Sequence, residues 1–102
     1  MNLSLAARYG VFDALERADA GSLRIIAPDG AHLRFGAGGP EAEIAIRDWR
    51  TLPALLARGD IGFGEAYAEG WWESPDLETL FAFGLNNQHA LGAMLRGSPW
   101  SR

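Results

Sequence analysis

Histidines and carboxylates are the side chains of this sequence that offer acid–base or metal chemistry. His32 and His89 lie far apart in the sequence, and no Cys is present to accompany them. Zinc and redox metals are bound by closely spaced His, Cys and carboxylate ligands, and no such spacing occurs here. We therefore expect no metal site and interpret both histidines as solvent-exposed.

Five carboxylates gather in one short stretch: Glu65, Glu69, Glu73, Asp76 and Glu78. Glu65 and Glu69 are four residues apart, which places them on one face of a helix. Like charges at this spacing are typical of a solvated surface, whereas paired acid–base catalysis needs burial that separates two pKa values. The serines lack a G-x-S-x-G turn, and the glycines of residues 36–39 lack the order of a dinucleotide-binding loop. We predict no catalytic residue, and no autonomous enzyme, in these 102 residues.

The amino-acid composition makes some classes of binding partner improbable. Thirteen acidic residues face nine basic ones, all arginines, which gives a net charge of −4. Nucleic-acid binding needs a cationic surface, so we expect no nucleic-acid partner. The absence of Cys excludes disulfides and fits a cytoplasmic protein. No segment resembles a signal peptide or a membrane span, and a peripheral position at the inner membrane stays open.

Aromatic side chains are the richer signal, and they gather in one segment: Phe63, Tyr67, Trp71, Trp72, Phe81 and Phe83. Most of them are expected to build the core. Trp71 and Trp72 are adjacent, so in a strand they point to opposite faces. We predict that Trp72 faces the interior and that Trp71 faces a partner or a lipid.

Alternation of apolar and polar residues predicts three strands. Two short alternating runs flank the turn residues Pro28, Asp29 and Gly30, which is typical of a β-hairpin. The run 41–48 alternates again, with Ala42, Ile44 and Ile46 on one face.

Helical spacing predicts the remaining elements. Residues 4–18 carry apolar side chains at helical intervals. A second helix is expected to begin at Asp48 or Thr51 and to end at Gly59, and a short third one covers 63–70. After a short strand at 71–73, Ser74 is predicted to cap a further helix, with Pro75 in its first turn.

This order of elements predicts an α+β domain. We expect a small, mostly antiparallel sheet of about four to five meandering strands with helices packed on one face.

The sequence also carries a resemblance that extends over nearly its whole length. The shared features are Asp48-Trp49 after a strand, Leu-Leu-Ala-Arg-Gly-Asp at 55–60, Gly-Phe-x-Glu-Ala-Tyr at 62–67, Gly70-x-Trp72, and Ser-Pro-Asp-Leu at 74–77. Together they resemble the N-terminal domain of bacterial cyclopropane-fatty-acyl-phospholipid synthases. The hairpin sequence of residues 28–43 matches that family as well.

A looser likeness is to sterol-carrier-protein-2-like domains, which hold acyl chains between a sheet and helices. The resemblance implies a lipid site lined by Phe63, Tyr67, Trp72, Leu80 and Phe81, with Trp71 at an interface.

In the synthases of that family, this domain is followed by a methyltransferase domain that binds S-adenosylmethionine and bicarbonate. No residue of this sequence matches its catalytic or cofactor-binding motifs, so we expect no cofactor in this chain. We interpret residues 1–97 as the accessory domain and 98–102 as the start of a linker, and we favour a piece of a longer protein over a domain encoded alone. The implied parent is a synthase that acts on phospholipid acyl chains.

The implied role is to help bind a phospholipid acyl chain and to dock on the methyltransferase domain. Two alternatives stay open: a protein-interaction or dimerisation module without a lipid site, and a stand-alone lipid carrier.

Overall fold

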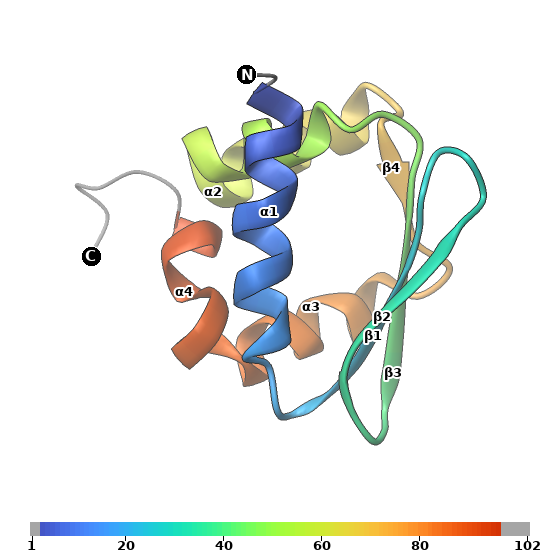
Figure 1. Ribbon diagram of the computed structural model, residues 1–102, viewed down its shortest axis with the longest axis vertical. Helices are drawn as coiled ribbons and strands as arrows, with labels where there is room; N and C mark the ends of the chain where they lie inside the picture. The colour runs from blue at the N-terminus through green and yellow to red at the C-terminus, as the bar shows by residue number, and fades with distance from the viewer. Residues whose placement is uncertain (1–2, 97–102) are drawn as a thin grey trace.

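The computed structural model describes residues 3–96, with four helices and four strands in one α+β unit (Figure 1). In chain order these are α1 (Leu3–Glu16), β1 (Gly21–Ile26), β2 (His32–Ala37), β3 (Glu41–Ile46), α2 (Thr51–Ala68), β4 (Trp72–Glu73), α3 (Leu77–Asn86) and α4 (Gln88–Arg96). The predicted α+β class is confirmed. The predicted linker, residues 98–102, lies outside the described residues.

The sheet has the strand order β2-β1-β3-β4. β1 pairs antiparallel with β2 and parallel with β3, and β3 pairs antiparallel with β4. A meander would have placed β2 in the centre, so that part of the prediction is wrong. The chain instead leaves β2, passes β1 and returns on its other side as β3.

One face of the sheet builds the core. Leu23 and Ile25 of β1 and Ala42, Ile44 and Ile46 of β3 are all buried, as their alternation predicts. Figure 1 shows the helices gathered on one side of the sheet, and that side is the buried one. The prediction of helices on a single face is confirmed.

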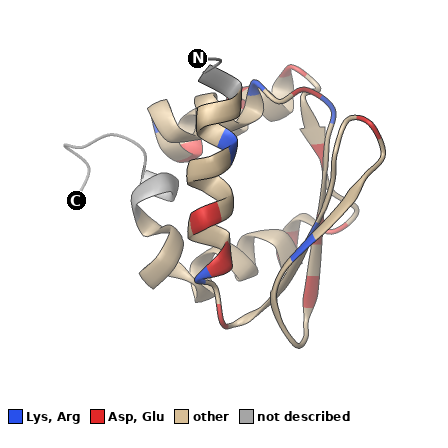
Figure 2. Cartoon of the chain, viewed as in Figure 1, with Lys and Arg blue, Asp and Glu red and all other residues tan. Residues whose placement is uncertain are grey.

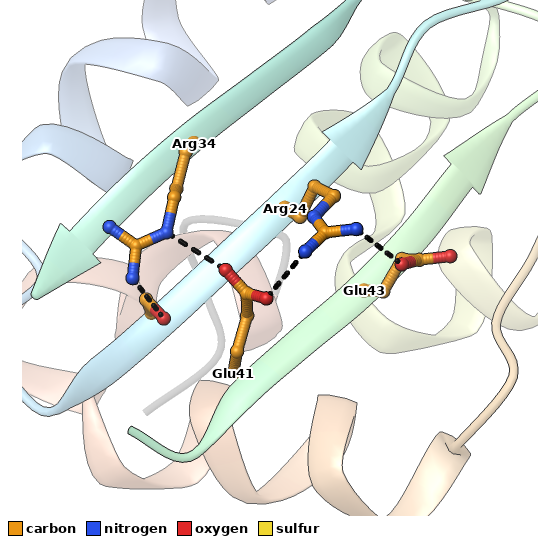
Figure 3. A network of polar contacts seen from close by, with 5 residues as sticks. Arg24, Arg34, Glu41 and Glu43 are labelled. Atoms are coloured by element: carbon orange, nitrogen blue, oxygen red, sulfur yellow. Dashed lines mark hydrogen bonds and ion pairs between the residues drawn. The ribbon is translucent and has the colours of Figure 1, made fainter. Parts of the chain in front are cut away.

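The opposite face carries a network of charged side chains (Figure 3). Glu41 accepts hydrogen bonds from Arg24 and Arg34, each at 2.8 Å, and Arg24 also approaches Glu43 at 3.5 Å. The hydrogen bond from Arg34, followed by the field of Arg24, holds the pKa of Glu41 below its ordinary value. Figure 2 shows basic and acidic positions scattered over the fold without a large patch of either sign.

α2 is two helical segments joined at a kink. Gly59 has φ 61° and ψ −137°, a backbone conformation outside the helical region that glycine adopts with ease. The predicted break at Gly59 is therefore confirmed. Gly62 lies in the angle between the two segments, where an added Cβ would stand 2.1 Å from the carbonyl oxygen of Ala54.

The start of α3 corrects one predicted cap. Asp76, not Ser74, is the N-cap residue, and its carboxylate accepts a hydrogen bond from the backbone N–H of Thr79. Hydrogen bonds from Thr79 hold the pKa of Asp76 below its ordinary value. Ser74 instead donates its hydroxyl hydrogen to the carbonyl oxygen of Glu43, which ties the loop to β3.

Asn87 lies between α3 and α4, and its side chain connects this junction to the loop that follows α1. Its side chain is fully buried, and its amide oxygen accepts from the backbone N–H groups of Asp19 and Ala20. Its NH₂ group donates to the carbonyl oxygens of Ala20 and Phe83. One amide therefore links the loop after α1 to the end of α3.

Candidate functional site: an apolar cavity

A cavity of about 290 Å³ lies between the buried face of the sheet and the helices. Its volume is close to the lower end of the range for small-ligand pockets, roughly 300 Å³. The lining comes from every helix and from the two central strands: Val11, Leu15, Leu23, Ile25, Ile44, Ile46, Leu52, Leu55, Asp60, Phe63, Leu80, Phe81, Phe83, Gly84, Leu85 and Leu91.

The lining is hydrocarbon almost throughout, and its exposed members mark the mouth. Phe81 and Leu85 of α3 are 50% and 62% exposed, and Asp60 at the kink of α2 is exposed as well. The strand residues at the far side are buried. The cavity therefore runs from an apolar lip between α2 and α3 to the sheet.

Three of the five predicted lipid-binding residues line this cavity. Phe63 lies on α2, and Leu80 and Phe81 lie on α3. Phe63 belongs to the segment of α2 that follows the kink at Gly59. Their contact with a lipid stays a prediction.

The other two predicted lining residues stand behind the cavity wall. Trp72 is 2% exposed, which confirms its predicted interior position, but it does not line the cavity. Its ring stacks on Phe63 at 4.1 Å, and its Nε1–H donates to the carbonyl oxygen of Phe63 at 2.8 Å. Tyr67 is 46% exposed and contacts Trp72 at 4.8 Å, so its predicted inward position is wrong. Trp72 therefore supports Phe63, and Tyr67 packs on Trp72.

Trp71 comes directly before β4 and is half-buried, in contact with the edge of the core. The guanidinium of Arg50 stands 4.4 Å from the centre of its ring. Trp71 also borders a second, more polar hollow along α2, together with Arg58, Glu65 and Glu69. Its predicted contact with a partner stays a prediction.

Sequence reasoning missed most of the lining. Val11, Leu23, Ile25 and Ile44 carry a clear apolar alternation or helical spacing, which predicts burial but does not tell a filled core from a hollow one. Asp60 carries no apolar signal at all. Its position next to a glycine that ends a helix is the only hint that it stands at a mouth.

The clustered carboxylates do not form an acid–base pair. Glu65 pairs with Arg58 and Glu73 pairs with Arg47, while Asp76 caps α3. Among the residues that the structure describes, no group of three or more His, Cys, Asp or Glu side chains is arranged to hold a metal ion. His32 is exposed as predicted, and His89, also exposed, lies 3.3 Å from Asp19.

Comparison with known proteins supports part of the resemblance. The chain is 34% identical over 55 residues to the cyclopropane-fatty-acyl-phospholipid synthase of Escherichia coli strain K12, and equally to that of Escherichia coli O6:H1. Half of the chain is similar to part of these synthases. The match covers 50% of this chain and 14% of each relative.

The same comparisons leave the finer likeness without support. No family model matches the chain, and no solved structure matches it either. The likeness to sterol-carrier-protein-2-like domains therefore finds no support. Within the described residues, no helix is both long enough and apolar enough to cross a membrane.

Proposed function

We propose that this chain is a non-catalytic accessory domain of a cyclopropane-fatty-acyl-phospholipid synthase-like protein. Its task is to hold one acyl chain of a phospholipid and to dock on a methyltransferase domain that binds S-adenosylmethionine. The observation that carries the lipid part is the hydrocarbon-lined cavity with its exposed lip at Phe81 and Leu85. The partial match to the synthases supports the assignment to such a protein.

An acyl chain suits this cavity because both lack polar groups. Each methylene that leaves water for an apolar site contributes about 0.8 kcal/mol, so several methylenes suffice for measurable binding. The exposed rings and methyl groups at the lip would otherwise face water, and a bound chain covers them. Of the residues described, the lining offers only one carboxylate, which is too little to orient a polar substrate.

The docking part is supported by the partial match and by Trp71. A half-buried Trp beside an Arg is a common feature of protein interfaces, where both residue types are enriched. The hollow at Trp71 and the lip at Phe81 involve different residues, so lipid and partner need not compete for the same surface.

The test is to block the cavity without unfolding the protein. Ile44→Phe places a larger side chain into the cavity from the centre of β3, where an aromatic residue is compatible with a strand. Leu33→Phe adds the same kind of bulk on β2 outside the cavity and serves as the control. Binding of an oleoyl lysophospholipid is followed by tryptophan emission and by the NMR signals of the Leu and Ile methyl groups.

We expect the lipid to shift methyl signals of the lining residues. We also expect Ile44→Phe to weaken binding by about tenfold or more, and Leu33→Phe to bind as the unaltered chain does. Tryptophan emission should respond because Trp72 stacks on Phe63, which lines the cavity. An unaltered chain that gives no methyl shifts with lipid refutes the lipid site. If that chain still associates with the methyltransferase domain, the interaction-module alternative holds instead.

A further inference from the structure

Asp60 is an acid placed in a hydrocarbon lining. It is the one ionisable side chain among the described residues that line the cavity, and it is exposed, as the lining residues Phe81 and Leu85 are. The other lining residues contribute only apolar groups and the backbone of Gly84. A ligand whose chain enters the cavity therefore leaves its end group near this carboxylate.

Asp60 has no side-chain partner among the residues that the structure describes. In the described part of the chain, no hydrogen bond or ion pair involves its carboxylate, whereas Glu65 in the next turn pairs with Arg58. Asp76 and Asp48 have clear structural tasks, because each accepts hydrogen bonds from a backbone N–H nearby. Among the described residues, no hydrogen bond or ion pair occupies the Asp60 carboxylate, so its charge can act on a ligand.

The positive end of the helical segment that begins at Asp60 does not make the charge at the cavity mouth positive. Asp60 begins the second segment of α2, whose first N–H groups carry roughly half a positive charge. The carboxylate contributes a full negative charge at the same place, so the sum is negative. The nearest basic residue along the chain, Arg58, is engaged by Glu65 on the side of the Trp71 hollow.

We propose that Asp60 selects against anionic end groups at the cavity mouth. The site then takes a hydrocarbon chain whose end group is uncharged or cationic, such as an esterified acyl chain or an alkyl amine, and rejects a free fatty acid. This inference rests on the proposed function, since it requires a chain in the cavity. It adds a specificity residue that the apolar lining alone does not provide.

The expected effect is modest but measurable. Repulsion between two unit charges about 4 Å apart in bulk water corresponds to a preference of roughly fivefold for an uncharged probe over an anionic one, and to a larger preference as water is excluded. Attraction of a cationic probe should be of similar size.

The experiment compares three 18-carbon probes with the same double bond: oleate, oleyl alcohol and oleylamine. Each displaces N-phenyl-1-naphthylamine, an uncharged fluorescent probe, from the full chain at pH 7 and below the probe's aggregation limit. We expect oleyl alcohol and oleylamine to compete better than oleate. Asp60→Asn should bring oleate to within about twofold of oleyl alcohol, and Asp60→Lys should make oleate the better competitor.

Glu16→Gln is the matched control. It removes one negative charge from an exposed position of α1 that does not line the cavity, so it changes the net charge as Asp60→Asn does. Its probe order should be that of the unaltered chain. Thermal unfolding of each variant verifies that it is folded.

The outcomes separate the two proposals. If none of the three probes displaces the fluorophore, the lipid site itself is refuted. If all three bind and Asp60→Asn and Asp60→Lys leave their order unchanged, the cavity binds lipid but Asp60 does not select the end group. If Glu16→Gln changes the affinity order of the three probes as much as Asp60→Asn does, the effect is due to net charge, and the role of Asp60 is overturned.

Discussion

Asn87 illustrates how much of this fold depends on a single polar side chain. Its amide makes four hydrogen bonds to backbone groups of Asp19, Ala20 and Phe83, and the side chain is fully buried. The amide oxygen accepts two hydrogen bonds and the NH₂ group donates two, so every polar atom of this buried side chain has a partner. The arrangement fixes the end of α1 against the junction of α3 and α4.

Replacing Asn87 should therefore destabilise the chain severely. Asn87→Ala leaves several buried N–H and C=O groups unpaired, each at a cost of about 1–3 kcal/mol. We expect a loss of about 3 kcal/mol or more, which lowers the thermal midpoint by more than about 10 °C. Asn86→Ala, at the exposed neighbouring position, should change stability by less than about 0.5 kcal/mol. Equal midpoints for the two variants would contradict the structural role of Asn87.

Residue types alone predicted some side-chain positions and not others. Alternation predicts only that adjacent tryptophans face opposite sides of a strand, and the Gly70-x-Trp72 feature shared with the synthases pointed to Trp72 as the buried one, which the structure confirms. The cap of α3 did not follow, because Ser74, Pro75 and Asp76 offer two possible starts, and the bond from Ser74 to Glu43 decides between them. Asn87 carried no signal, since an Asn between two helices usually lies at the surface.

At the scale of elements, the kinked α2 places Phe63 and Asp60 at the cavity. Two glycines make the kink possible for different reasons: Gly59 through its positive φ, and Gly62 through its contact with the carbonyl oxygen of Ala54. Gly64, one turn away from the kink, has open space around its Cα. These three positions differ in what a methyl group would meet.

Gly62→Ala and Gly64→Ala should consequently have opposite effects. A Cβ at Gly62 would lie 2.1 Å from a backbone oxygen, which forces the segments of α2 apart at a cost of about 2 kcal/mol or more. A Cβ at Gly64 meets nothing, so the variant gains helix propensity of up to about 1 kcal/mol. Denaturant unfolding of both variants measures the difference. A Gly62→Ala variant as stable as Gly64→Ala would mean that the two segments do not pack closely.

Elements were predictable from sequence where their periodicity is local. Strands β1, β2 and β3 and the break in α2 follow from alternation and from Gly59. The strand order did not follow, because β1 and β3 are both apolar on one face and their pairing joins segments far apart in sequence. Periodicity predicts which residues are buried, but it does not predict which residues they contact.

At the scale of the whole molecule, the cavity is a product of this topology. The two central strands, β1 and β3, supply its floor, and all four helices supply its walls. The family resemblance led to the wall residues Phe63, Leu80 and Phe81, but the floor of the cavity was not predicted. A hollow core and a filled core share the same apolar pattern, so only the packed fold separates them.

The loop of residues 38–40, which connects β2 to β3, has a minimum length. Ala37 pairs with Gly21 and Glu41 pairs with Ser22, so the connection must step over β1 and cover about two strand spacings, roughly 10 Å. Four residue steps reach at most about 13–14 Å, whereas three reach about 10–11 Å. The connection is therefore close to the shortest that can make the crossing.

Shortening and lengthening this loop should have unequal effects. Deletion of Gly38 would pull one edge strand out of register and cost about 2 kcal/mol or more. Insertion of one Gly beside it should cost less than about 0.5 kcal/mol, because loop entropy grows slowly with length. Gly38 and Gly39 contact nothing that a longer loop would displace. Denaturant unfolding of the two variants tests this, and equal losses would contradict it. The crossing thus fixes a minimum length without a maximum, and the position between Gly38 and Gly39 is a place to insert a peptide tag without changing the cavity.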